Sequence, residues 1–163
     1  MMTLTTRTHT VIESPFGPLT AVADDGVLSG LYLPGHLRGP GPERLGERDD
    51  DGFEEIRRQL TEYFAGTRIE FTVRLAPAGT PFQQSVWHEL MTIPYGQTRS
   101  YGQLALALGG PHLTRAVGAA NGRNPISIVV PCHRVVGSDG SLTGYAGGLP
   151  RKRFLLDLEA RDR

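Results

Sequence analysis

The sequence TPFQQSVWHELMTIPYGQTRSYGQLALALGGPHLTRAVGAANG, residues 80–122, decides the fold of the second half of the chain. It contains two helix-start signals of the capping-box type, in which Thr80 or Ser100 is followed three positions later by glutamine. Apolar residues at helical spacing follow each signal and recur between Leu113 and Asn121. Short helices joined by a glycine-containing turn predict a helix-turn-helix.

The outer face of the last of these helices carries one long side chain, Arg115, among Gly118, Ala119 and Gly122. A helix that reads bases in the major groove needs several long polar side chains, and here only one can reach. The smooth face therefore favours sequence-independent binding in the minor groove, with Arg115 as an intruding side chain. Close packing against another helix of the same protein explains the small residues equally well.

The first half of the chain has strand patterns followed by a helix pattern. Phe53–Ala65 places apolar residues on one helical stripe, and the acidic run ERDDDG at 47–52 is expected to be a solvated loop. No group of side chains in this half is typical of a reaction site, so we expect a scaffold. Three alternating segments separated by turn signals predict antiparallel strands: Thr8–Ser14, Leu19–Ala23 and Val27–Leu33.

These patterns predict an α+β fold with two domains. Residues 1–78 form a small antiparallel sheet with a helix, and residues 79–163 form a mostly helical, winged-helix-like unit that contains the helix-turn-helix. The composition, with 39% hydrophobic and 21% charged residues, is that of a soluble globular protein. We find no membrane-length apolar run and no secretory signal, and we expect a cytoplasmic protein with no membrane partner.

The chemistry of the chain is narrowed by what the sequence lacks. Its one cysteine, Cys132, excludes an internal disulfide and any site of several thiolates, and we expect no metal. Neither a phosphate-binding loop with its lysine nor a dinucleotide-binding glycine motif is present, which argues against nucleotide-driven chemistry.

The net charge of zero hides two unlike halves. Residues 1–79 carry 8 Arg against 12 acidic residues, and residues 80–163 carry 9 basic against 5 acidic residues. The segment from Arg99 to Arg153 contains seven basic residues and one acidic residue, Asp139. This asymmetry predicts a polyanion partner for the second half, and a solvated basic surface is the alternative.

The stretch NPISIVVPCHRVVGSDG, residues 124–140, contains the cysteine. Ile126–Val130 is an apolar, β-branched run that predicts a buried strand, and the proline after it places Cys132 where that strand becomes a loop. The neighbours His133 and Arg134 are expected to lower the pKa of the thiol and favour the nucleophilic thiolate. The alternative is a small buried thiol without a chemical role.

A carboxylate in the last helix suggests a partner for this cysteine. Glu159 lies four residues after Leu155 and shares its inward face, although the helix dipole disfavours an acid near a C-terminus. If Glu159 orients His133 and His133 activates Cys132, the three form a relay that activates a nucleophile. An exposed Glu159 at a frayed helix end is the alternative.

Several of these motifs together resemble one family. VPCHRVVGSDGSLTGYAGG, preceded by RAVGAANGRNP, IPYGQTRSYGQLA and FQQSVW, resembles the O6-alkylguanine-DNA alkyltransferases, also called methylated-DNA–protein-cysteine methyltransferases. The resemblance covers essentially all of residues 80–160 and, more loosely, the element order of the first half. The PCHRV motif with these flanks is highly specific.

The resemblance implies a role for each matching residue. Cys132 corresponds to the acceptor thiol, His133 to its base acting through water, and Glu159 to the carboxylate that completes the relay. Asn124 matches a hinge asparagine next to the PCHR loop. Tyr101 matches a tyrosine that rotates the target phosphate and donates a proton to the base.

The resemblance also implies DNA and substrate contacts. Arg115 corresponds to an arginine finger that fills the gap left by a flipped base, and Ala146 stands where some members have serine, so a hydroxyl contact is missing here. The further DNA contacts expected are Tyr101, Thr114, Gly118, Ala119, Gly122, Arg123 and Arg134. The expected base pocket consists of Val135, Tyr145, Ala146, Gly147 and Gly148.

The activity implied is direct repair of DNA. The alkyl group of O6-alkylguanine, and also of O4-alkylthymine, passes to Cys132 in one turnover and without a cofactor. Zinc, which some relatives bind in the first domain, is not expected because no cysteine stands there. We expect a monomer that binds double-stranded DNA, with cooperative assembly on DNA as a further expectation.

Two other functions remain open at this stage. A cysteine hydrolase would also use Cys, His and Glu, but it needs an oxyanion hole and has no use for a helix-turn-helix. A DNA-binding protein that only senses alkylation damage would not need Cys132.

Overall fold

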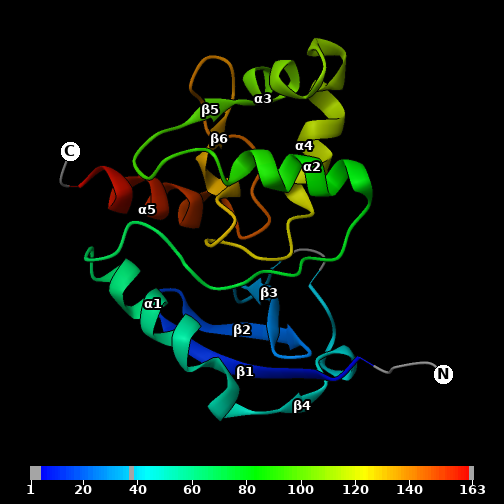
Figure 1. The fold of residues 1–163 in the computed structure, drawn as a ribbon. Helices are drawn as coiled ribbons and strands as arrows, with labels where there is room; N and C mark the ends of the chain where they lie inside the picture. The colour runs from blue at the N-terminus through cyan, green and yellow to red at the C-terminus, as the bar shows by residue number, and fades with distance from the viewer. Residues whose placement is uncertain (1–4, 37–38, 162–163) are drawn as a thin grey trace.

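The computed structural model describes residues 5–36 and 39–161 (Figure 1). It confirms the α+β class, with an antiparallel sheet in the first half and a mostly helical second half. The outermost residues of the two expected domains, 1–4 and 162–163, lie outside the described residues. In the described part of the chain, no helix is both long enough and apolar enough to cross a membrane.

The sheet is a meander of the three predicted strands. β1 (Arg7–Ser14), β2 (Gly17–Asp24) and β3 (Val27–Tyr32) pair antiparallel in sequence order. The turn between β2 and β3 has positive φ at Asp25 (50°) and Gly26 (81°). Two consecutive left-handed residues match the right-handed twist of a tight hairpin, which explains the sequence DDG at this point.

The acidic run 47–52 is exposed to solvent as we expected, but it is not a loop. Its first residues form β4 (Glu47–Arg48), which pairs with β1 in parallel at the edge of the sheet. The next residues form a short 3₁₀ helix, η2 (Asp50–Phe53), that leads into the first α-helix. The carboxylates find local donors: Asp49 caps the 3₁₀ helix, and Asp50 accepts a 2.7 Å hydrogen bond from the Thr10 hydroxyl.

Helix α1 (Glu54–Phe64) lies across one face of the sheet (Figure 1). Its side chains Ile56 and Leu60 are buried, and the Arg57 guanidinium donates to the carbonyl oxygen of Val11 in β1. After α1 the chain crosses to the second half through an extended linker.

The second half begins with the capping boxes that the sequence predicts. Thr80 caps α2 (Pro81–Leu90) and Ser100 caps α3 (Tyr101–Leu108), and in both boxes the hydroxyl and the glutamine make reciprocal hydrogen bonds of 2.8–3.1 Å. The remaining elements are β5 (Arg99–Ser100), η3 (Pro111–Leu113), α4 (Thr114–Gly122), η4 (Cys132–Arg134), β6 (Val135–Val136), which pairs in parallel with β5, and α5 (Leu149–Ala160).

The run Ile126–Val130 is buried as predicted, but it does not form a strand. Ile128 has a φ of 73°, and the Val130 amide donates to the Ile126 carbonyl at 3.0 Å, so the backbone turns back on itself. Only the first residue of the run pairs with the sheet, as a bridge between Ile126 and Leu31. A left-handed β-branched residue interrupts the extended conformation that its sequence favours.

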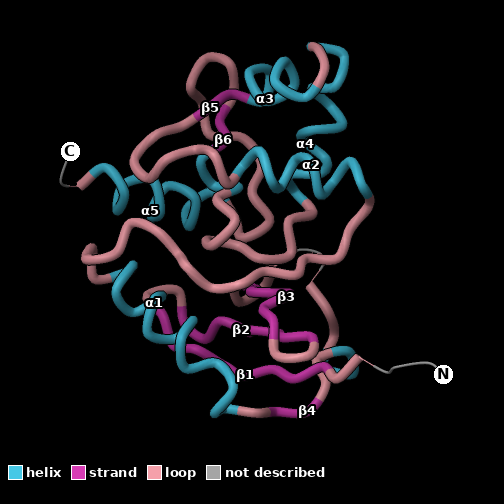
Figure 2. The backbone as a smooth tube through the Cα atoms, in the orientation of Figure 1, coloured by secondary structure: helices cyan, strands magenta, loops and turns pink. Residues whose placement is uncertain are grey.

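The two halves share their interior. The edge of β3 that does not face β2 is paired by the linker at Leu75 and by the turn at Ile126, both drawn as loop in Figure 2. One continuous hydrophobic core contains buried residues of the sheet, of α1 and of the helical half. The boundary between residues 78 and 79 therefore stays a prediction.

Candidate active site

Cys132 begins the 3₁₀ helix η4 and is only 4% exposed. Burial raises the pKa of its thiol to about 11, and this outweighs the opposing effects of the Asn124 side chain and the Lys152 charge. The expectation that His133 and Arg134 would lower the pKa of this thiol is therefore wrong for the DNA-free protein. The thiol is protonated at neutral pH and needs a base to become a nucleophile.

The next residue, His133, is the candidate for this base. His133 Nε2 lies 2.8 Å from Glu159 Oε2, and both side chains are buried. Burial lowers the pKa of His133 despite the neighbouring carboxylate, so the imidazole is neutral near pH 7. Its other ring nitrogen, Nδ1, is buried and makes no hydrogen bond within the described residues. This is the nitrogen that remains for accepting a proton.

Glu159 lies inside the protein, not at a frayed end. Although burial favours its neutral form, hydrogen bonds from His133 and Arg134 outweigh this effect and hold the pKa of Glu159 well below its usual value. The carboxylate is ionised and orients the imidazole, as the relay requires.

Arg134 is placed differently from our expectation. Its guanidinium donates to both Glu159 oxygens at 2.8 and 3.0 Å and to the Ile93 carbonyl at 2.7 Å. The side chain is buried and these donors are occupied, which argues against the DNA contact that we expected of Arg134. The fifth position of the motif PCHRV, Val135, is also buried in the core.

Two buried polar residues near the relay were missed at the sequence level. Tyr63 of α1 donates its hydroxyl to Glu159 Oε2 at 2.6 Å, although the first half was expected to be only a scaffold. Its place on the apolar stripe of α1 was the available signal, because a buried tyrosine hydroxyl needs a partner. Lys152 is fully buried on the face of α5 that carries Leu155 and Glu159, which was a signal of the same kind.

Lys152 fixes the loop that leads to α5. Its Nζ donates to the carbonyl oxygens of Thr143 at 2.8 Å and Gly144 at 3.3 Å. Burial lowers the pKa of Lys152 to about 8, and the charge that it keeps at neutral pH favours the Cys132 thiolate.

Asn124, predicted as a hinge, ties the turn before the cysteine. Its amide donates to the Val130 carbonyl at 2.9 Å and its oxygen accepts from the Ile126 amide at 3.0 Å. The same side chain lowers the pKa of the Cys132 thiol, against the larger effect of burial.

A pocket of about 270 Å³ opens between α4 and the loop before α5. Tyr101 closes one side and donates its hydroxyl to the Thr143 carbonyl at 3.3 Å. Cys132 is not part of the lining, but Asn121, which lines the pocket, donates its amide to the Cys132 carbonyl at 3.5 Å. Of the five predicted base-pocket residues, only Tyr145 and Ala146 line it. Its full lining is Tyr101, Gly118, Asn121, Gly122, Gly144, Tyr145 and Ala146.

Gly147 and Gly148, also predicted for this pocket, do not line it. They allow close packing and a turn of the backbone before α5. A Cβ on Gly147 would lie 2.9 Å from the side chains of Leu33 and Tyr145, so a side chain there would require one of these neighbours to move. Gly148 has a φ of 92° and turns the chain into α5.

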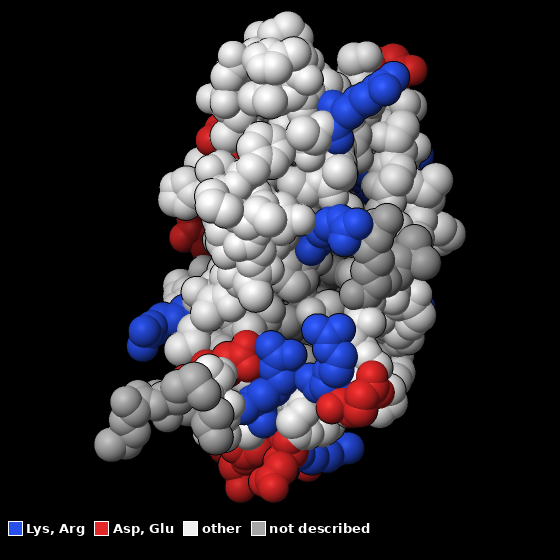
Figure 3. All heavy atoms as spheres, turned by 90° about the vertical axis from the view of Figure 1, so that its right-hand side faces the viewer, with Lys and Arg blue, Asp and Glu red and all other residues white. Residues whose placement is uncertain are grey.

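The outer face of α4 is as smooth as its sequence implies. Arg115, Ala119 and Arg123 are exposed, and the Thr114 hydroxyl donates to the Pro111 carbonyl at 2.7 Å. Because Arg134 and Lys152 are interior, fewer cations face solvent than the sequence count implied. Figure 3 shows scattered basic side chains on one side of the molecule, most of them in its lower half, where acidic side chains lie beside them.

Comparison with known proteins identifies the family. The model of the 6-O-methylguanine DNA methyltransferase DNA-binding domain matches residues 81–161, and that of the ribonuclease-like domain of the same proteins matches residues 8–77. The chain belongs to this family. A methylated-DNA–protein-cysteine methyltransferase of Methanosarcina acetivorans is 49% identical over 93% of this chain and 97% of its own length.

Solved structures of the 6-O-methylguanine DNA methyltransferase family agree with the fold. The crystal structure of the Mycobacterium tuberculosis O6-methylguanine methyltransferase has a TM-score of 0.87 and 49% identity, covering 96% of this chain and 94% of its own. The M. tuberculosis OGT in complex with DNA has the same TM-score and identity, covering 94% and 93%.

Proposed function

We propose that this member of the family repairs DNA by transferring the alkyl group of O6-alkylguanine irreversibly to its own Cys132. One observation carries the proposal: the buried Cys132 precedes a buried His133–Glu159 pair, and its carbonyl is bound by Asn121, which lines a pocket walled by α4. The family model of a DNA-binding domain over residues 81–161 supports DNA as the partner of that wall.

The buried position of Cys132 requires that the damaged nucleotide leaves the duplex. The buried Cys132 thiol cannot reach the alkyl carbon of a guanine that is stacked in the duplex. Extruding the nucleotide costs a few kcal/mol, less for a damaged pair. The smooth face of α4 allows its backbone to approach DNA closely, and the exposed Arg115 then fills the vacated place in the stack. The pocket next to α4 receives the base, with Tyr145 at its inner end.

The transfer is a single displacement. His133 Nδ1 takes the thiol proton through water, Glu159 stabilises the resulting imidazolium, and the sulfur forms a bond to the alkyl carbon. The bond between that carbon and O6 breaks, its electron pair stays on the departing guanine, and the Tyr101 hydroxyl supplies a proton to the base. Ala146 offers no hydroxyl, so its backbone N–H is the remaining donor there.

The product limits the protein to one turnover. A thioether has no easy leaving group, so alkylated Cys132 is not regenerated. We extend the proposal to O4-alkylthymine as a second lesion, and to a monomer that assembles cooperatively on DNA. We also propose that the protein acts in the cytoplasm, because the chromosome lies there in the bacteria and archaea of its relatives.

Intact-mass spectrometry tests the proposal directly. After incubation with duplex DNA that contains O6-methylguanine, we expect the protein to gain the mass of one methyl group, located on Cys132 by peptide mapping. Cys132→Ser should gain nothing yet bind the DNA normally, since the thiol makes no phosphate contact. Labelling by an activated ester but not by methylated DNA would refute repair and support the hydrolase alternative.

A further inference from the structure

Tyr63 connects the first half of the chain to the relay. Its hydroxyl lies 2.6 Å from Glu159 Oε2, and both side chains are buried. Burial and the neighbouring carboxylate raise the pKa of Tyr63 well above its ordinary value, so the hydroxyl stays protonated and acts as the donor. A helix that precedes Cys132 by more than sixty residues thus supplies a direct ligand to the carboxylate of the relay.

The Glu159 oxygens are shared unequally among their donors. Among the described residues, Oε1 accepts from Arg134 Nε alone, whereas Oε2 accepts from Tyr63, His133 and the second Arg134 nitrogen. Each additional donor to a carboxylate oxygen reduces its basicity. The hydroxyl of Tyr63 therefore donates to the same oxygen that accepts the hydrogen bond from the His133 imidazole.

Several other charged and titratable side chains lie around the relay. The charged and titratable side chains that face His133 and Glu159 from the packed elements are Tyr63 of α1, Tyr95 before β5, Cys132 and Arg134 of η4, Tyr145 of the pocket loop and Lys152 of α5. Removing the Tyr63 hydroxyl alone leaves all the other charges in place.

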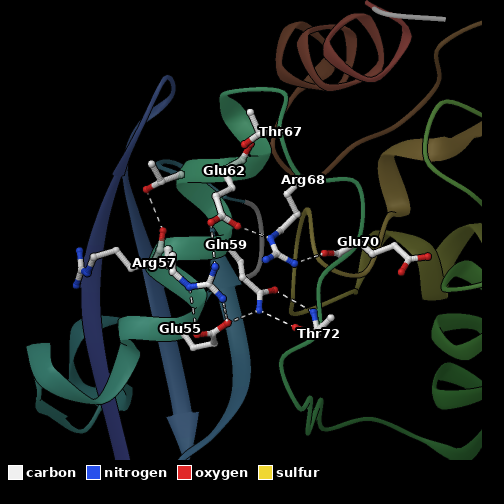
Figure 4. A network of polar contacts seen from close by, with 10 residues as sticks. Glu55, Arg57, Gln59, Glu62, Thr67, Arg68, Glu70 and Thr72 are labelled. Atoms are coloured by element: carbon white, nitrogen blue, oxygen red, sulfur yellow. Dashed lines mark hydrogen bonds and ion pairs between the residues drawn. The ribbon is translucent and has the colours of Figure 1, made fainter.

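Helix α1 is held in position without that hydroxyl. Figure 4 shows Gln59, one turn before Tyr63, pointing at the linker, where it accepts from the Thr72 amide at 2.9 Å and donates to the Thr72 hydroxyl at 2.8 Å. Arg68 adds a 2.7 Å ion pair to Glu62 of the same helix. The ring of Tyr63 also packs on Phe71 of the linker, with centroids 5.3 Å apart. A phenylalanine at position 63 keeps this packing.

We propose that Tyr63 is a positioning residue of the alkyl transfer: its hydroxyl holds Glu159 Oε2 toward His133 and weakens the hold of that carboxylate on the imidazolium proton. This inference rests on the proposed function. Without the hydroxyl, Oε2 is more basic and stabilises protonated His133 more strongly. His133 then stays protonated up to a higher pH and cannot accept the thiol proton. The rate of transfer therefore falls at low pH, before it changes at high pH.

The test compares Tyr63→Phe with Thr72→Val. Thr72→Val also removes one hydroxyl that hydrogen-bonds across α1, because the Thr72 hydroxyl accepts from Gln59 of α1. It does not touch Glu159. For each protein, the single-turnover rate of transfer from O6-methylguanine duplex DNA is measured between pH 5 and 9, together with DNA affinity and melting temperature. The His133 ring is titrated in parallel by NMR in the DNA-free protein, with its signal assigned from His133→Gln.

We expect Tyr63→Phe to move the acid limb of the rate profile and the His133 titration upward by about 0.5 pH unit or more. The rate then falls about threefold on the acid limb and stays within about twofold of wild type at pH 9. DNA affinity is unchanged, and Thr72→Val keeps the wild-type limb. Identical limbs and titrations in Tyr63→Phe and wild type would overturn the proposal, as would an equal, pH-independent loss in both variants. The NMR titration decides the question even if the protein transfers no methyl group.

Discussion

The side-chain amide of Asn124 donates to the carbonyl oxygen of Val130 at 2.9 Å, and so closes the turn that ends just before Cys132. The same side chain accepts from the Ile126 amide at 3.0 Å. These bonds satisfy backbone groups in a buried segment that has a left-handed residue and no ladder of its own. The position of the thiol therefore depends on one asparagine.

Asn124→Ala should destabilise the protein by about 2–4 kcal/mol, because buried backbone groups lose their partners. Urea unfolding of the full chain measures this loss. Asn121→Ala is the comparison, since the Asn121 amide makes one longer contact of 3.5 Å to the Cys132 carbonyl. A smaller loss in Asn124→Ala than in Asn121→Ala would contradict the role of Asn124 in the turn.

His133→Phe should slow transfer at pH 7 by about 10²-fold or more, the usual contribution of a positioned base. The thiol must then ionise unaided, and its pKa is raised to about 11 by burial. Below that pH the thiolate fraction, and with it the rate, rises about tenfold per pH unit. Single-turnover assays from pH 7 to 10 should show this steep rise in the variant and a flatter profile in the wild type. Equal rates of the two proteins at pH 7 would exclude the relay.

Lys152 should make the stability of the protein depend on pH. Burial lowers its folded pKa to about 8, whereas in the unfolded chain it titrates near 10.4. Between these values the unfolded chain binds the proton and the folded protein does not, so the contribution of Lys152 to stability rises with pH. We expect the unfolding free energy of wild type relative to Lys152→Met to increase by about 1 kcal/mol between pH 8 and 9.

Unfolding in urea at the two pH values, below the range where Cys132 titrates in the folded state, measures this difference. Lys152→Met keeps the aliphatic stem in the core but loses the bonds to Thr143 and Gly144, and it should be less stable at both pH values. A difference in stability that is independent of pH would show that folded Lys152 keeps its proton up to pH 9, so that burial does not lower its pKa.

Arg115→Ala should slow repair of duplex O6-methylguanine much more than repair of the free base or a short single strand, where no stack has to be filled. The salt dependence of DNA binding should change by less than about one counterion, because Arg115 is not expected to bind a phosphate. Arg123→Ala, at the end of the same helix, is the control and should lose about one unit of salt slope with little effect on flipping. Equal losses on duplex and free base for Arg115→Ala would contradict base flipping.

The local rules of helix and strand formation accounted for most of the fold. The capping boxes at Thr80 and Ser100 and the turn at Asp25–Gly26 depend on residues three positions apart or fewer, and all three form as predicted. Ile126–Val130 differs because long-range contacts decide it. Its first residue joins the edge of β3 and Asn124 binds its last carbonyl, which overrides the strand preference of β-branched residues.

The candidate site was predictable where the residues are close in sequence or on a simple helix face. Cys132 and His133 are adjacent, and Glu159 shares the inward face of α5. Tyr63 was not predictable as a ligand of Glu159, because its role depends on how α1 packs against the helical half. The direction of the pKa shift of Cys132 was wrong for a related reason. Proximity in sequence suggested that Arg134 would act on the thiol, while the fold turns its guanidinium to Glu159.

The outer edge of β3 is paired by two later segments of the chain, and this has a consequence for synthesis of the protein. That edge is paired by Leu75 in the linker and by Ile126 in the turn before Cys132. While the ribosome is still making the second half, the nascent sheet has an open strand edge, the feature by which folding intermediates aggregate. The segment that covers the last part of that edge is the one that brings the cysteine into place. Completing the sheet edge therefore also places Cys132, before Glu159 of α5 completes the relay, and slow translation between residues 80 and 130 should prolong the vulnerable period.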